Sequence, residues 1–153
     1  MSKITALRTL RIAERPNLVW LELETDDGLT GLGESFRGAE TVATALHELV
    51  APWLLGRDSR QIEAVSRHLT TPYLGFHSSG AEMRAASAVD IALWDLAGQR
   101  HGVPTFVAMG GGSRDSVRVY NTCSGYAYNT GGVARRSIGA EDSAAGPYDD
   151  QIA

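Results

Sequence analysis

The segment AASAVDIALWDLAGQ, residues 85–99, constrains the fold of this chain more than any other stretch. On a helical wheel its apolar residues cover well over half of the circumference. The remaining narrow stripe is formed by Arg84, Ser87, Asp95 and Gly98. A helix that is apolar most of the way round is buried on more than one side. We therefore expect this helix to pack between two layers, and we expect one of them to come from outside the chain.

The same helix carries two carboxylates, Asp90 and Asp95, which raise the question of an active site. They are five residues apart, so they lie about 140° apart around a helix and do not share a face. Asp95 falls on the polar stripe with Arg84, and Asp90 lies at its border. Because a buried carboxylate needs a partner, we expect both to bind other segments rather than to act as a catalytic pair, and for Asp90 the partner would come from a neighbouring segment or from the layer outside the chain.

Alternating polar and apolar residues predict two strands, at 3–12 and 18–25. Asp27-Gly28 favours a tight hairpin turn into a short third strand, LTGLGE, at 29–34. Gly31 and Gly33 in that strand indicate a bulge or a close backbone approach. The prediction is a three-stranded antiparallel meander with helices against its apolar face. In the first strand, the residues expected on one side are Ile4, Ala6, Leu10 and Ile12.

Three helices should follow the strands. The first is predicted from apolar residues at helical spacing, with Gly56 as its stop: Val42, Leu46, Leu49, Val50 and Trp53. Asp58 with Gln61 has the spacing of a capping box for the second helix, which should bury Ile62, Val65 and Leu69. Ser79 with Glu82 has the same spacing before the long helix, which should end near its C-terminal signals Arg100, Gly102 and Pro104.

Composition excludes several classes of protein. With 14 Lys and Arg against 18 Asp and Glu, the net charge of −4 argues against nucleic-acid and anionic-membrane partners. The single cysteine, Cys123, rules out an internal disulfide and is typical of a reducing cytosol. The first fifteen residues are interrupted by charges, so they form neither a signal peptide nor a membrane span. We expect a cytoplasmic protein.

Four blocks of sequence together resemble the amino-terminal region of the enolase superfamily, in its mandelate racemase and muconate lactonizing enzyme branch. They are ETDDGLTGLGES, LLGRD, RAASAVDIALWDLAGQRHGVPTFVAMGG and VRVYNT, and the resemblance spans residues 3 to about 123. It implies an α+β capping domain at 1–112, a meander followed by a helical bundle. The start of a (β/α) barrel at 113–153 would follow, with a first strand at about 117–123. Because residues 124–150 show no convincing period, we expect the barrel to be incomplete here.

The resemblance also implies a chemistry. Such enzymes remove the proton α to a carboxylate with a Lys or His base and stabilise the product with Mg²⁺. The metal ligands and bases of the family lie on later barrel strands, beyond Ala153, and Lys3 is the only lysine here. We therefore expect no catalytic residue and no metal ligand in this chain. His47, His68 and His77 do not form the paired spacing of metal ligands and are expected on the surface or in a loop.

What the family's capping domain supplies is substrate selection, through two loops that close over the barrel mouth. The first of these loops maps to 14–17 and the second to 34–38. An arginine beside an aromatic residue suits a carboxylate-bearing substrate, because guanidinium pairs bidentately with carboxylate. Barrel sites lie at the carboxyl ends of strands, which adds residues 121–123. The substrate-binding candidates are Arg15, Asn17, Glu34, Ser35, Phe36, Arg37, Asn121, Thr122 and Cys123.

These observations predict the capping part of a Mg²⁺-dependent acid-sugar (aldonate or aldarate) dehydratase. The polar character of Glu34, Ser35 and Arg37 favours dehydration over the alternatives within the superfamily, a racemase or epimerase and a cycloisomerase. The expected partners are a small hydroxy-carboxylate, the chain's own carboxyl-terminal barrel and, in the full-length enzyme, further copies of itself. An alternative of another class is a stand-alone binding or assembly module without catalysis. The long helix argues against that alternative, because in a stand-alone module its second apolar face would be exposed as a large patch.

Overall fold

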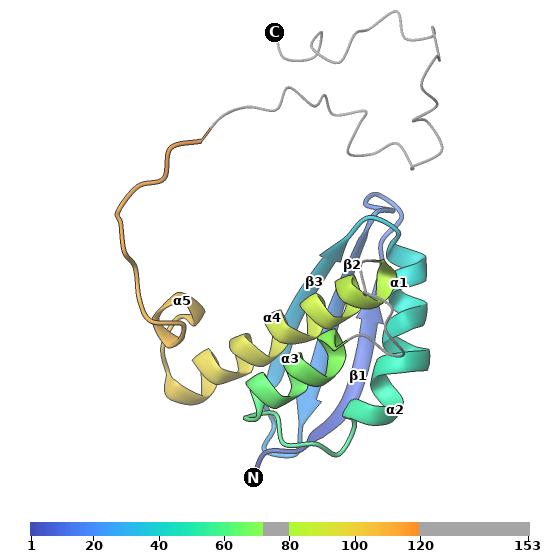
Figure 1. The fold of residues 1–153 in the computed structure, drawn as a ribbon, viewed down its shortest axis with the longest axis horizontal. Coiled ribbons are helices and arrows are strands. Elements are labelled where there is room, and N and C mark those ends of the chain that lie inside the picture. Colours follow the sequence, from blue (N-terminus) through green and yellow to red (C-terminus); the bar gives the residue numbers. More distant parts are fainter. Residues whose placement is uncertain (72–79, 120–153) are drawn as a thin grey trace, which may run out of the picture.

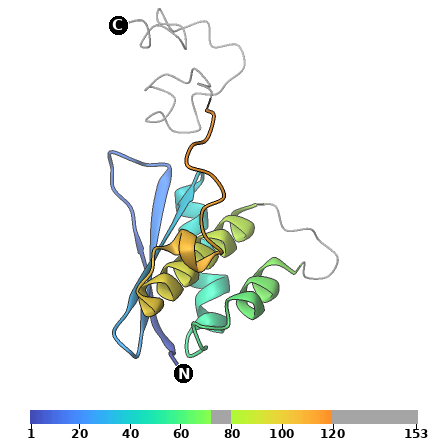
Figure 2. The same ribbon diagram turned by 90° about the vertical axis from the view of Figure 1, so that its left-hand side faces the viewer.

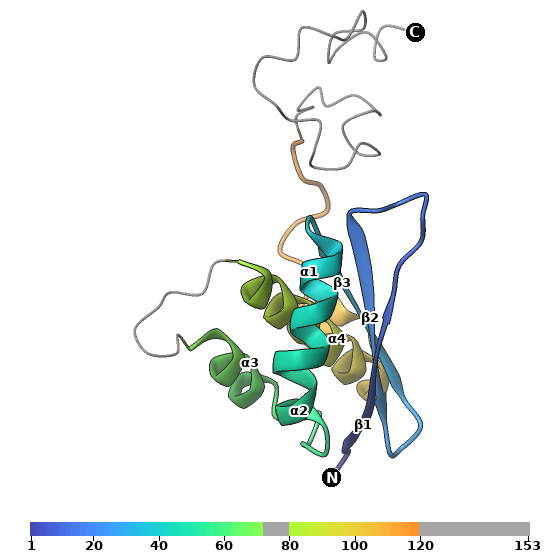
Figure 3. The same cartoon turned by 90° about the vertical axis from the view of Figure 1, so that its right-hand side faces the viewer.

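The computed structural model describes residues 1–71 and 80–119, which form a small sheet with helices packed on one of its faces (Figure 1). Figures 2 and 3 show the sheet along one side of the molecule and helices α1 to α4 along the other. The α+β class expected from the sequence is confirmed. The elements are β1 (Ile4–Leu10), β2 (Leu18–Thr25), β3 (Thr30–Phe36), α1 (Ala39–Ala45), η1 (Leu46–Val50), α2 (Ala51–Leu54), α3 (Ile62–Thr70), α4 (Ala81–His101) and α5 (Thr105–Ala108).

The sheet is the predicted meander, with antiparallel strands in the order β1-β2-β3. The hairpin between β2 and β3 turns at Gly28, whose φ of 85° is available to glycine at no steric cost. Strand β2 alternates strictly, because its inner face contacts the helices. That face consists of Val19, Leu21 and Leu23, each 1% exposed or less.

Strand β1 departs from the predicted alternation. Its pairing with β2 shifts register between Ile4 and Ala6, where one extra residue is inserted. Such a bulge moves every later side chain to the opposite face of the strand. Ile4 is buried as expected, but Leu10 is 56% exposed and pairs with Trp20 on the outer face. The expectation that Ala6, Leu10 and Ile12 share a face with Ile4 is therefore wrong.

Helices α1, η1 and α2 follow one another without a break from residue 39 to residue 54. The middle segment is a π-helical turn in which the Ala51 N–H donates to the Leu46 carbonyl, five residues back. Pro52, next in the chain, has no N–H to continue the regular bonding. The wider turn spaces the buried residues four apart, at 42, 46, 50 and 54, and leaves Leu49 65% exposed. The prediction that Leu49 belongs to the apolar face is wrong for this reason.

Helix α3 buries Val65 and packs Ile62 and Leu69 partly against the core, as predicted. Its start differs from the prediction, because Gln61 is the N-cap and no side chain caps the helix. The Asp58 carboxylate instead accepts from the N–H of Arg60 and from the N–H of Ser2. The predicted capping box of Asp58 and Gln61 is therefore wrong. Ser79, the other predicted cap, lies outside the described residues.

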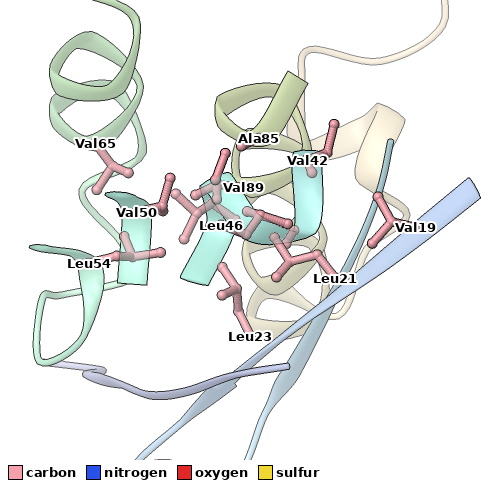
Figure 4. Packing of buried hydrophobic residues seen from close by; sticks show 14 of the residues in the cluster. Val19, Leu21, Leu23, Val42, Leu46, Val50, Leu54, Val65, Ala85 and Val89 are labelled. Atoms are coloured by element: carbon pink, nitrogen blue, oxygen red, sulfur yellow. The ribbon is translucent and has the colours of Figure 1, made fainter. Parts of the chain in front are cut away.

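Helix α4 forms the centre of the hydrophobic core (Figure 4). It packs against β2 and β3 on one side and against α1, η1 and α3 on another. It ends at Gly102, which adopts the left-handed conformation typical of a helix stop, as predicted. Both neighbouring layers belong to the described part of the chain, so the expectation that one comes from outside is wrong. Its buried apolar residues are Ala85, Ala86, Ala88, Val89, Ala92, Leu93 and Leu96.

After α4 the chain makes the short helix α5 and continues without a strand to residue 119. Residues 117–119 are the described part of the first barrel strand that the resemblance implies, and they are not in a strand here; 120–123 lie outside the described residues. Within 1–71 and 80–119, no helix combines the length and the apolar character needed to cross a membrane.

Candidate functional site

The candidate substrate-binding residues that the structure describes come from two loops at the same end of the sheet. Because the strands are antiparallel, the connection from β1 to β2 and the connection from β3 to α1 emerge side by side, at the top of Figure 1. The Arg37 N–H donates to the Asn17 carbonyl at 2.8 Å, and Leu18 pairs with Phe36 in the sheet. The two loops predicted from the sequence are thus joined directly.

The side chains of this loop pair divide between two surfaces. Arg15, Glu34, Phe36 and Arg37 are exposed and Asn17 is half-buried. Strand β3 alternates, so Ser35 points to the helix side and is only 9% exposed. The two joined loops therefore carry two exposed arginines and an exposed aromatic residue, and a guanidinium group can bind an anionic ligand. The remaining candidates lie outside the described residues: Asn121, Thr122 and Cys123.

Strand β3, which leads into the second loop, is held along its free edge by side chains of α4. The Asp95 carboxylate accepts from the Leu32 N–H at 2.9 Å, and Gln99 donates to the Thr30 carbonyl at 2.8 Å. Gln99 also donates to Asp95, and Arg84 donates to the Phe36 carbonyl at 2.7 Å. Asp95 therefore binds a neighbouring segment, as predicted. The polar stripe of the sequence indicated polar partners for α4, but not that these partners would be the backbone of β3.

The glycines of β3 explain why α4 can lie so close to this edge. A Cβ at Gly31 would lie 2.3 Å from the Ala92 carbonyl oxygen, and a Cβ at Gly33 would lie 2.1 Å from that of Ala88. Only glycine permits this contact between the two backbones. The close approach predicted from these glycines is confirmed, and the bulge, the other possibility, lies in β1 instead.

A second polar cluster lies at the opposite end of the sheet, around the amino terminus. Arg100 donates to the hydroxyls of Ser2 and Ser59, and its Nη2 lies 3.7 Å from the Asp27 carboxylate. Asp58, which precedes Ser59 in the chain, accepts two hydrogen bonds from the Arg60 guanidinium. These bonds hold the pKa of the Asp58 carboxyl well below its usual range. A hydrogen bond from Thr25 likewise lowers the pKa of Asp27. These groups fix the amino terminus to the segment before α3.

The described residues do not provide a metal centre. Within 1–71 and 80–119, no three His, Cys, Asp or Glu side chains gather in a way that could hold an ion. His47 bonds to the Thr9 hydroxyl at 2.9 Å, and the ring of His68 stacks on Trp53 at 3.6 Å. Both histidines are exposed, as predicted, while His77 lies outside the described residues.

Known sugar-acid dehydratases are similar to this chain in sequence. It is 39% identical over 127 residues to the D-mannonate dehydratase of Novosphingobium aromaticivorans, which covers 80% of this chain and 31% of that protein. It is 40% identical over 126 residues to the D-galactonate dehydratase of Verminephrobacter eiseniae, covering 80% of this chain and 32% of that one. The chain thus spans about a third of the length of these curated relatives.

Solved structures agree with the sequence comparison. An enolase protein from the environmental genome sequencing of the Sargasso Sea has a TM-score of 0.75 and 62% identity, covering 82% of this chain and 34% of that chain. An enolase from Pantoea ananatis with bound D-gluconate and Mg has a TM-score of 0.68 and 31% identity, covering 76% and 29%. Residues 5–110 match the family model for the mandelate racemase / muconate lactonizing enzyme N-terminal domain. With its meander, its covering helices and this match, the chain belongs to the mandelate racemase and muconate lactonizing enzyme family of the enolase superfamily.

Proposed function

We propose that this chain is the amino-terminal, substrate-capping part of a Mg²⁺-dependent acid-sugar dehydratase. The observation that carries the proposal is the similarity to dehydratases of D-mannonate and D-galactonate, which extends over 80% of the chain. The family match at residues 5–110 includes the strands and the long helix that position the two candidate loops. The reaction class is a hydro-lyase acting on a sugar-derived hydroxy acid.

The proposed reaction removes a proton from the carbon next to the carboxylate and expels the hydroxyl from the carbon beyond it. One C–H and one C–O bond break, water leaves, and the resulting enol becomes a 2-keto-3-deoxy acid. The described residues hold no candidate metal site, so we assign no step to groups of this chain acting through Mg²⁺. The Pantoea enolase was solved with D-gluconate and Mg bound, which supports a dependence on Mg²⁺. We propose that the metal ligands and the acid–base residues lie in parts of the enzyme outside the residues described.

The role proposed for this chain is to recognise the substrate. Arg37 and Phe36 are consecutive exposed residues, and Arg15 is exposed on the adjoining loop. An arginine can pair with a carboxylate through two parallel hydrogen bonds, and Glu34 and Asn17 can accept from or donate to sugar hydroxyls. We leave Ser35 out of this set, because its side chain is buried on the helix side. The boundary of the capping unit near residue 112, a cytoplasmic location and homo-oligomerisation remain predictions.

A chimera tests this function. Residues 1–119 of this chain replace the aligned amino-terminal third of the Sargasso Sea enolase, whose 62% identity favours a compatible junction. The purified chimera is incubated with Mg²⁺ and with D-mannonate, D-galactonate, D-gluconate or galactarate, and 2-keto-3-deoxy products are measured as semicarbazones. We expect dehydration of at least one acid sugar.

The same experiment separates the alternatives. A folded chimera that racemises or epimerises its substrates without releasing water would show that the enzyme is an isomerase and not a dehydratase. A folded chimera that is inactive, beside an unmodified enolase that dehydrates an acid sugar, would contradict the capping role. That last result would favour a stand-alone binding module.

A further inference from the structure

The turn that joins β3 to α1 has an unusual backbone. Arg37 has a φ of 73°, and within 1–71 and 80–119 it is the one residue other than glycine with a positive φ. Gly38 follows with a φ of 71°. A residue with a side chain is disfavoured in this left-handed region, so its surroundings must hold it there.

Two hydrogen bonds hold the peptide group between Phe36 and Arg37. Its carbonyl oxygen accepts from Nη1 of Arg84 at 2.7 Å, and its N–H donates to the Asn17 carbonyl at 2.8 Å. Rotation of this peptide group would break both bonds at once. Because the orientation of the peptide group determines φ at Arg37, the two bonds together select the left-handed turn.

Arg84 is well placed to act as a fixed support. It belongs to the first turns of α4 and lies 48 residues further along the chain than Phe36. The same helix contacts the β3 backbone at Gly31 and Gly33 and binds its edge through Asp95 and Gln99. The position of Arg84 is therefore set by the core, whereas the turn it holds lies on the surface.

We propose that Arg84 is a positioning residue that fixes the direction in which Arg37 presents its guanidinium to a carboxylate substrate. This proposal rests on the proposed function, because it assigns Arg37 to substrate recognition. Without Arg84, the Phe36–Arg37 peptide group can rotate and Arg37 relaxes to a negative φ. The side chain then leaves the substrate side even though the fold is intact.

The variant Arg84→Met removes the donors and keeps a long side chain, and Gln99→Met is its matched control. Gln99 makes the same kind of bond, to the Thr30 carbonyl, at the other end of β3. In this chain we expect Arg84→Met to speed amide exchange at Arg37 at least tenfold, and Gln99→Met to leave that rate within twofold. If Arg84→Met does not fold, Arg84→Ala is measured in its place, and Arg84→Lys, which retains a donor, should restore slow exchange.

The chimera described above tests the consequence for recognition. We expect Arg84→Met to lower kcat/KM about tenfold, mainly through KM, and Gln99→Met to change it less than twofold. In an Arg37→Ala background, Arg84→Met should have less than a twofold further effect, because its action passes through Arg37. Equal losses in the two Met variants, or unchanged exchange at Arg37, would overturn the proposal. If the folded unsubstituted chimera dehydrates no acid sugar while the unmodified enolase does, the proposed function fails, and the exchange rates alone decide whether Arg84 holds the turn.

Discussion

The contact between β3 and α4 can be tested by adding one methyl group. In Gly33→Ala the new Cβ would lie 2.1 Å from the carbonyl oxygen of Ala88 and 3.0 Å from its carbonyl carbon. Both atoms belong to the helix backbone, so no side-chain rotation can make room. Since carbon and oxygen normally approach to about 3.3 Å, α4 must withdraw from β3 by about 1.2 Å.

That withdrawal has a calculable cost. Overpacking of this kind typically costs about 1–3 kcal/mol. The bond from the Leu32 N–H to Asp95, now 2.9 Å, would lengthen beyond hydrogen-bond distance, and a bond to a charged group contributes about 1.5–3 kcal/mol. Because Asp95 is half-exposed and water replaces part of that bond, we expect a total loss near 3 kcal/mol. For a domain of this size, that loss lowers Tm by about 12 °C.

Urea unfolding followed by circular dichroism measures this loss, with Glu34→Ala as the control. Glu34 is the next residue on β3, and its side chain is exposed on the opposite face, so we expect a change within about 0.5 kcal/mol. Gly31→Ala, whose Cβ would lie 2.3 Å from the Ala92 oxygen, should resemble Gly33→Ala. A loss below about 1 kcal/mol in both glycine variants would refute the close backbone contact.

Two further predictions concern the carboxylates. Asp95→Leu should destabilise the chain by about 1–2 kcal/mol, because it leaves the Leu32 N–H without an acceptor and removes one of the two acceptors of the Gln99 amide. Asp95→Asn keeps an acceptor oxygen and should lose less than half as much, so equal losses in urea unfolding would contradict this reasoning. The hydrogen-bonded pair with Arg60 lowers the pKa of Asp58 in the folded state. The pair therefore stabilises the fold at pH values above the unfolded pKa of about 3.9, and this stabilisation is lost as the pH falls below that value. The urea midpoint should therefore fall more steeply between pH 5 and pH 3 in the unsubstituted chain than in Asp58→Asn, and parallel curves would exclude this role.

The sequence predicted the elements well where local pattern and packing agree. The alternation of β2, the turn at Gly28 and the end of α4 at Gly102 all appear in the structure. The two loops that the resemblance implies lie at the same end of the sheet, where the bond from the Arg37 N–H to the Asn17 carbonyl joins them. Each of these features depends on a short stretch of chain or on the antiparallel order of the strands.

The remaining features depend on residues that are distant in sequence. The bulge after Ile4 has no glycine or proline signal, so the outward turn of Leu10 could not be read from the pattern. Asp58 has capping-box spacing, but Ser2 and Arg60 compete for its carboxylate. The apolar residues around α4 suggest a missing layer, because the sequence does not show that α1, α3 and the sheet all pack against this one helix. The hydrogen bond from Arg84 to the Phe36 carbonyl likewise joins residues 48 positions apart.

The central claim, that residues of this chain recognise an acid-sugar carboxylate, is tested most directly by Arg37→Ala in the chimera. Losing a charge-assisted bond of about 1.5–3 kcal/mol should lower kcat/KM for the preferred acid sugar roughly 10- to 100-fold. Arg67→Ala is the control, because Arg67 is an exposed arginine on α3 that pairs with Glu63 away from the candidate loops, and it should change kcat/KM less than twofold. Both variants should melt within a few degrees of the parent. Equal kcat/KM in Arg37→Ala and the parent would contradict the account.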